Sequence, residues 1–214
     1  AHFIEHMAFN GSKPVRAGEM TRILERLGLA FGADTNATTS LNFTVYKLDL
    51  PRTDDETVDT ALFLMRETAG EISFAPSAVD SERGIVLSEQ QTRDSFGIRQ
   101  LRNYFQFAMP DTNLGYRLPG GKAEVLKTAS ADKMKDLYHR YYRPENATLV
   151  LVGDFDVDAI EQKIKGKFSD WKGVGLAGAP INRGTVNTER PFAVGSFVDP
   201  AVPESISLSR VTPY

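Results

Sequence analysis

The sequence contains no cysteine among its 214 residues, and it has only three histidines. Without cysteine the protein forms neither disulfides nor thiolate metal sites, so any metal must be held by histidine and carboxylate side chains. The absence of cysteine suits the cytosol, the periplasm and an organelle matrix equally well. No apolar run approaches the length of a membrane span, and we therefore expect no transmembrane helix.

An excess of charge of one sign is also lacking. The formal net charge is -3 and no basic stripe dominates, so we expect no nucleic-acid partner. The composition, with 41% hydrophobic and 25% charged residues, is that of a globular protein large enough for one large domain or two small ones. There is no internal repeat, no low-complexity run and no glycine-rich phosphate loop.

Two of the three histidines lie near the start, in the run His2-Phe3-Ile4-Glu5-His6, which reads H-x-x-E-H. On a helix these positions are i, i+3 and i+4, and the three polar side chains are expected to share one face. Two neutral imidazoles one turn apart can bind one divalent ion, and the carboxylate can reach a water on that ion. The motif predicts metal-assisted hydrolysis, in the inverse of the commoner zinc-protease order. The alternative is an ordinary helix surface.

A catalytic zinc site needs a third protein ligand and one open position for water. The third histidine, His139, has no acidic or histidine partner at ligand spacing, so we interpret it as a surface or packing residue. A helix predicted from about residue 77 to 92 carries Glu82 and Glu89, which are two turns apart and therefore on one face. Either one is a candidate ligand, and both can equally be solvated charges at the edge of an apolar stripe.

Periodicity and turn residues predict the remaining elements. Helices are expected at 19–27, 53–69, 98–107, 130–141 and 157–168, and strands at 42–50, 147–153, 193–198 and 205–211. The stretch 32–40 is small and polar, and we expect a flexible approach to the first strand. Strands and helices mix without strict β-α-β alternation, which favours an α+β layer architecture over a doubly wound sheet.

Several separated segments, in family order, resemble the N-terminal domain of the M16 metallopeptidases, the inverzincin family of insulysin, pitrilysin and the mitochondrial processing peptidase. The resemblance extends over residues 1–172. It is carried by HFIEHMAFNGS at residues 2–12, NATTS at 36–40 with TVY at 44–46, ERGIVLSE at 82–89, YYRPEN at 141–146 and LVLVGDF at 149–155.

The resemblance implies a layered, mostly antiparallel sheet packed by helices, as in metallohydrolases of the LuxS and mitochondrial processing peptidase type. It also implies a zinc endopeptidase with one zinc ion and a peptide substrate. His2, His6 and Glu89 then correspond to the zinc ligands, Glu5 to the general base, and Glu82 to an acidic residue that supports the site. Because the interval from His6 to Glu89 is long for the family, Glu82 remains the alternative ligand.

The resemblance also places peptide binding beside Asn36 and Ala37, with an extended substrate paired to the edge of the 42–50 strand. In the family, a second homologous half closes over the first and contributes an Arg and a Tyr to the substrate carbonyl. The chain begins inside its motif, with no initiator methionine or signal peptide, so we expect an N-terminal truncation. We therefore expect residues 1–214 alone to bind metal weakly and to cleave peptides poorly.

We expect the peptidase domain to cover residues 1–172, a linker 173–191, and the truncated start of a following M16 region 192–214. Resemblance to bacterial members favours the bacterial periplasm over the cytoplasm, with a mitochondrial matrix less favoured. Two alternatives stay open. One is a non-catalytic M16-like scaffold or partner subunit, and the other is a metal-binding or structural domain of unrelated function.

Overall fold

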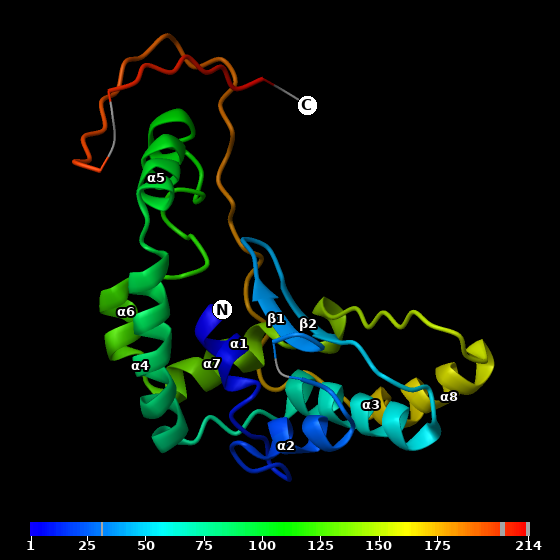
Figure 1. Cartoon of the computed structure of the whole chain (residues 1–214). Helices are drawn as coiled ribbons and strands as arrows, with labels where there is room; N and C mark the ends of the chain where they lie inside the picture. Colours follow the sequence, from blue (N-terminus) through cyan, green and yellow to red (C-terminus); the bar gives the residue numbers. More distant parts are fainter. Residues whose placement is uncertain (31, 202–203, 213–214) are drawn as a thin grey trace.

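The structure is a computed structural model and describes residues 1–30, 32–201 and 204–212. Its regular elements are mainly helical (Figure 1). The helices are α1 (His2–Met7), α2 (Glu19–Arg26), α3 (Asp55–Gly70), α4 (Pro76–Arg93), α5 (Phe96–Ala108), α6 (Ala123–Thr128), α7 (Ala131–Tyr141) and α8 (Val157–Phe168), with a short 3₁₀ turn, Pro144–Asn146. The strands are β1 (Thr35–Thr39) and β2 (Thr44–Leu48). The α+β class predicted from the sequence is confirmed.

Side-chain caps or a proline begin several of the helices. Ser130 accepts a hydrogen bond from the Lys133 amide and caps α7. α3 is capped by Asp54, which accepts the Thr57 amide at 3.0 Å. α4 has no side-chain cap and instead begins with Pro76, whose ring fixes a helical φ and whose missing N–H costs nothing there.

The described residues form one antiparallel hairpin, in which β1 pairs with β2 from Thr35↔Leu48 to Thr39↔Thr44. β2 confirms the strand predicted at 42–50. The expectation of a flexible approach at 32–40 is wrong, because β1 occupies most of it. Its sequence, TNATT, is polar but rich in β-branched threonine, which fits a pleated, half-exposed strand.

The main hydrophobic core holds α1 in place. The apolar side of α1 packs against residues from α4, α6 and α7, and Met7 and Val86 are completely buried. Burying an aliphatic side chain of this size contributes about 1.5–3 kcal/mol. α1 lies between α4 on one side and β1 on the other (Figure 1). The core therefore fixes the helix that carries the H-x-x-E-H motif with respect to both neighbours.

Three predicted strands, at 147–153, 193–198 and 205–211, are absent from the described residues of those segments. In the 147–153 segment, which is a continuous apolar run, Val150 is 73% exposed and Val152 93% exposed. An apolar run becomes a strand only when another backbone pairs with it, and no described segment pairs with this one. The sheet is accordingly smaller than the mostly antiparallel layer expected.

Two further segments complete the arrangement. α6 lies between α5 and α7 in the sequence, where no helix was predicted, and its Leu126 enters the main core. The segment after residue 181 runs beside α5, where Thr112 bridges Gly184 and Arg99 pairs with Asp199 at 2.7 Å. None of the helices in the described parts of the chain is long and apolar enough to cross a membrane.

Candidate metal centre

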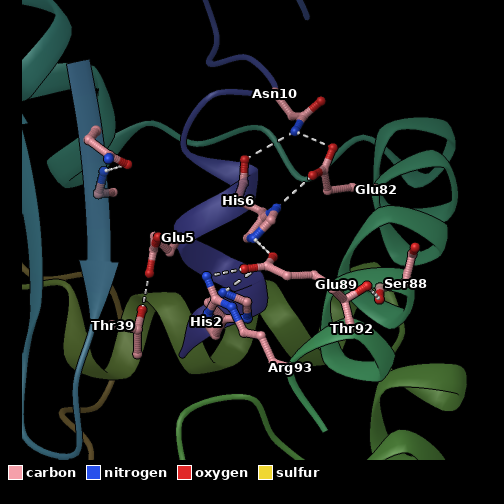
Figure 2. Close-up of polar contacts among 12 residues, drawn as sticks. His2, Glu5, His6, Asn10, Thr39, Glu82, Ser88, Glu89, Thr92 and Arg93 are labelled. Atoms are coloured by element: carbon pink, nitrogen blue, oxygen red, sulfur yellow. Dashed lines mark hydrogen bonds and ion pairs between the residues drawn. The ribbon is translucent and has the colours of Figure 1, made fainter. Parts of the chain in front are cut away.

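α1 places two imidazole rings one turn apart on the side that faces α4. The rings of His2 and His6 lie with centroids 4.7 Å apart and nearly perpendicular. Apolar neighbours at Phe3, Ile4 and Met7 take the core side of the same helix, so the local sequence directs the two histidines away from that core. Both rings point toward α4 (Figure 2).

Glu89 on α4 meets both rings. Its Oε2 lies 3.1 Å from His6 Nε2 and 3.7 Å from His2 Nε2, and the three donor atoms lie within 4.8 Å of one another. Donor atoms bound at about 2.0–2.2 Å to a tetrahedral Zn²⁺ are separated by about 3.3–3.6 Å, so the observed spacing fits that ion after small shifts. Two imidazoles and one carboxylate, with a fourth position free for water, are the donor set of a catalytic zinc site.

Glu82 contacts the other side of the His6 ring. Its Oε1 lies 2.7 Å from His6 Nδ1, and its Oε2 accepts a hydrogen bond from Asn10 at 2.9 Å (Figure 2). This hydrogen bond raises the pKa of His6 and lowers the pKa of Glu82. A carboxylate on Nδ1 fixes the ring orientation and leaves Nε2 directed at Glu89, the usual support for a metal-bound histidine. The structure thus brings Glu89 into the donor group and puts Glu82 behind it.

Asn10 is a residue that the sequence analysis missed. Its side chain donates to Glu82 and also to the His6 carbonyl oxygen at 3.0 Å, so it ties the end of α1 to α4. The signal was present in the spacing, because Asn10 follows His6 by one helical turn and shares its face. Gly11, with a φ of 106°, then turns the chain after the first helix.

His2 is the more deeply placed of the two rings. It is 8% exposed, and burial together with the neighbouring His6 lowers its pKa. Its Nδ1 atom is buried and makes no hydrogen bond to the described residues. A neutral imidazole is the form that binds a metal ion, so the pKa shift of His2 favours metal binding at neutral pH.

Glu5 lies on a different side of α1 from the one predicted. At about 100° per residue it is turned about 100° from His6, and its carboxylate points toward β1 (Figure 2). There its Oε2 accepts a short hydrogen bond from Thr39. Glu5 is 8% exposed and is outside the three-residue donor group. The expectation of one common face therefore holds for the histidines, whereas Glu5 occupies the neighbouring face.

The residues predicted to bind peptide are on β1. Asn36 and Ala37 lie in β1, where the Ala37 amide donates to Asn36 Oδ1 at 2.8 Å. β1 is also the strand whose Thr39 contacts Glu5.

His139 lies on α7 outside the donor group, as expected, with its ring against Tyr138. On α4, Arg93 forms an ion pair with Glu89 Oε1 and leaves Oε2 facing the histidines.

Comparison with known protein families identifies the family of this chain. The sequence model of the insulinase family, peptidase family M16, matches residues 1–109, and that of the peptidase M16 inactive domain matches residues 128–204. The chain belongs to the M16 peptidase family. The family is therefore the one that the sequence motifs resemble, whereas the division of the chain at residue 173 stays a prediction.

Individual M16 relatives include proteins described as zinc proteases. The probable zinc protease PqqL of Haemophilus influenzae is 36% identical over 169 residues, which cover 79% of this chain and 18% of that protein. The chloroplastic stromal processing peptidase of Arabidopsis thaliana is 32% identical over 95% of this chain and 15% of its own length. The chain thus spans less than a fifth of these relatives.

Solved M16 structures share the fold. The first half of the periplasmic protease PqqL from Escherichia coli matches with a TM-score of 0.81 and 30% identity, over 88% of this chain and 40% of that one. Pitrilysin matches with a TM-score of 0.71 at 20% identity, over 88% of this chain and 20% of its own. The architecture around α1 and α4 is therefore that of an M16 peptidase half.

Proposed function

We propose that this protein is a zinc-dependent endopeptidase that hydrolyses peptide bonds in oligopeptides or unfolded segments. His2, His6 and Glu89 hold one Zn²⁺, and Glu5 is the general base. The observation that carries the proposal is the convergence of three suitable donor atoms, from two helices far apart in sequence, within 4.8 Å. The zinc proteases among the relatives support the same reading.

The chain's own residues divide the chemistry between them. A zinc ion at these donors would supply Lewis acidity and would lower the pKa of a bound water to near neutrality. Glu5 takes a proton from the attacking water and later gives it to the leaving amine. Glu82 holds the His6 ring in the orientation in which Nε2 faces the donor group, and Asn10 holds Glu82.

Peptide binding is proposed at β1 rather than along β2. Asn36 and Ala37 lie in β1, and this strand contacts α1. An extended peptide laid along β1 gains affinity from backbone hydrogen bonds, with little demand on sequence. The Ala37 amide, which now donates to Asn36 Oδ1, would donate to a peptide carbonyl instead. A second M16 half, in the same or a partner chain, is proposed to close over this face.

The second candidate function is a non-catalytic M16 scaffold subunit. In that case the donor atoms need not converge, whereas here Glu89 faces both rings and Glu82 supports one of them. The complete arrangement favours the peptidase.

Changing Glu5→Gln in the full-length protein separates the two functions. The variant keeps the donor group but cannot accept the proton, so we expect bound zinc to stay the same and kcat on a fluorogenic peptide to fall at least about 10²-fold. Glu25→Gln, at an exposed position of α2, is the matched control and should match the wild type. Equal turnover by Glu5→Gln and wild type would refute the assigned base.

We also propose a bacterial periplasmic location. Support comes from the PqqL structures of Escherichia coli, which are described as a periplasmic protease. Osmotic-shock fractionation of the source cells should release the protein with periplasmic markers, and recovery with cytoplasmic markers would contradict the location.

A further inference from the structure

We propose that Thr39 is a positioning residue for Glu5, and that it stands at the end of a chain of four hydroxyl groups. The chain consists of Thr39, Thr44, Tyr142 and Tyr46. This inference rests on the proposed role of Glu5 as general base. It assigns a role to four hydroxyl groups that neither the metal donors nor peptide binding uses.

The contacts lead from the carboxylate into the protein. Thr39 hydrogen-bonds Glu5 Oε2 through its hydroxyl, and the same hydroxyl lies 3.3 Å from Thr44 Oγ1 in the last cross-strand pair of the hairpin. The Tyr142 hydroxyl is a neighbour of Thr44 and lies 2.7 Å from the Tyr46 hydroxyl. Hydroxyl groups from the hairpin and from the end of α7 thus gather beside the carboxylate of α1.

The chemistry of the end group sets the direction of this line. An ionised carboxylate only accepts hydrogen bonds, so Thr39 must donate to Glu5. The Thr39 oxygen is then free to accept from Thr44, whose hydroxyl lies 3.3 Å away. Hydrogen bonds that follow one another in this way polarise and strengthen one another.

The two oxygens of Glu5 have different surroundings. Oε2 is held by Thr39, whereas Oε1 accepts no hydrogen bond from the described residues and is not among the buried atoms without a partner. One oxygen is therefore anchored and the other is left for water. A base must lie within about 2.6–3.2 Å of the proton that it removes, so an anchor on one oxygen limits the positions of the other.

Burial explains why such an anchor is needed. Glu5 is 8% exposed, so a carboxylate at this position loses most of its hydration. Burial also raises the pKa of both the Tyr46 and the Tyr142 hydroxyl, so the two tyrosines stay protonated and remain able to donate. The hairpin would pair without the Thr39 hydroxyl, because its ladder consists of backbone hydrogen bonds.

Steady-state kinetics of the full-length, zinc-loaded protein test the proposal. Thr39→Val keeps the shape and removes the hydroxyl, and we expect kcat to fall about 10–100-fold, with KM and zinc affinity within about twofold of wild type. Thr39→Ser should restore kcat to within about threefold of wild type. Thr128→Val, an exposed threonine of α6, is the matched control. Unchanged kcat in Thr39→Val, or no rescue by serine, would overturn the assignment.

Tyr46→Phe tests the far end of the hydroxyl chain and leaves the Thr39 and Thr44 hydroxyls in place. It should lower kcat by a smaller factor, about 2–10-fold, because it removes only the last donor. An unchanged kcat would overturn the part of the proposal that concerns the two tyrosines.

A second measurement on metal-free protein does not depend on activity. Urea unfolding of Glu5→Met, Thr39→Val and the double variant forms a double-mutant cycle. Coupled effects are expected if the hydroxyl anchors the carboxylate, and additive effects would overturn the contact. Running Glu5→Gln in parallel separates the two proposals. If Glu5→Gln is active, Glu5 is not the general base. If Thr39 and Glu5 are coupled in stability but Thr39→Val keeps the wild-type kcat, only the positioning role of Thr39 is removed.

Discussion

At the scale of single residues, the two glutamates of α4 have different environments although they are two turns apart. Glu89 meets the Nε2 atoms of both histidines and an arginine, whereas Glu82 meets the Nδ1 atom of His6 and the amide of Asn10. Removing the charge of a zinc ligand and removing the charge of a supporting carboxylate are therefore expected to weaken zinc binding to different extents.

Glu82→Gln should weaken zinc binding about 10–100-fold, because loss of a supporting carboxylate has that typical cost. Glu89→Gln should weaken it more, since it removes an anionic donor. Both affinities are measured by competition with a chelator, with Glu124→Gln, on the exposed side of α6, as the control. If Glu82→Gln has the larger effect, Glu82 is the ligand, as the long interval to Glu89 had suggested.

At the scale of elements, the site depends on the relative placement of α1, α4 and β1. Glu82 and Glu89 of α4 face α1, and Val86 between them is buried in the main core. Gly84 in the same helix is exposed, and a Cβ added there meets no atom within 4 Å.

Gly84→Ala should therefore stabilise the protein. Alanine favours a helix interior by about 0.8–1 kcal/mol over glycine, and the free energy of unfolding is expected to rise by about that amount. Urea titration followed by circular dichroism measures it. Zinc affinity should not change, because the new methyl group points away from the donors; a drop in either quantity would show that α4 needs the flexibility of this glycine.

At the scale of the whole molecule, two partly buried tyrosines, Tyr46 and Tyr142, connect the hairpin to the end of α7. Burial raises the pKa of Tyr46 and of Tyr142 above the ordinary value of 10.0. A group whose pKa is raised in the folded state contributes stability that is complete below its unfolded pKa and is lost as the pH rises through the folded pKa.

The free energy of unfolding should therefore decrease as the pH rises above about 10, by about 1.4 kcal/mol per pH unit for each such tyrosine while only the unfolded state is ionised. Urea unfolding between pH 8 and 11 measures the slope. The double variant Tyr46→Phe/Tyr142→Phe should have a shallower slope, and Tyr116→Phe, an exposed tyrosine, should keep the wild-type slope. Equal slopes in all three would contradict the role of burial.

Local patterns predicted much of this molecule. The helices of the sequence analysis are found close to their expected positions, because apolar periodicity and breaking residues act within one or two turns of the chain. β1 was missed because its polar composition lacks the apolar alternation of a strand. The strand expected at 147–153 failed for the opposite reason, since its apolar run specifies no partner.

The sequence by itself determined the donor types and the helical spacing of His2 and His6, because cysteine is absent and a one-turn spacing is a local property. It left open which glutamate faces the rings, and it assigned no role to Thr39, Asn10 or the tyrosine pair. Only the tertiary structure decided these points. The choice between Glu82 and Glu89 depends on how α4 is rotated against α1, and the hydroxyl chain depends on the hairpin meeting α7. Both are set by core packing between segments tens of residues apart, which no local pattern records.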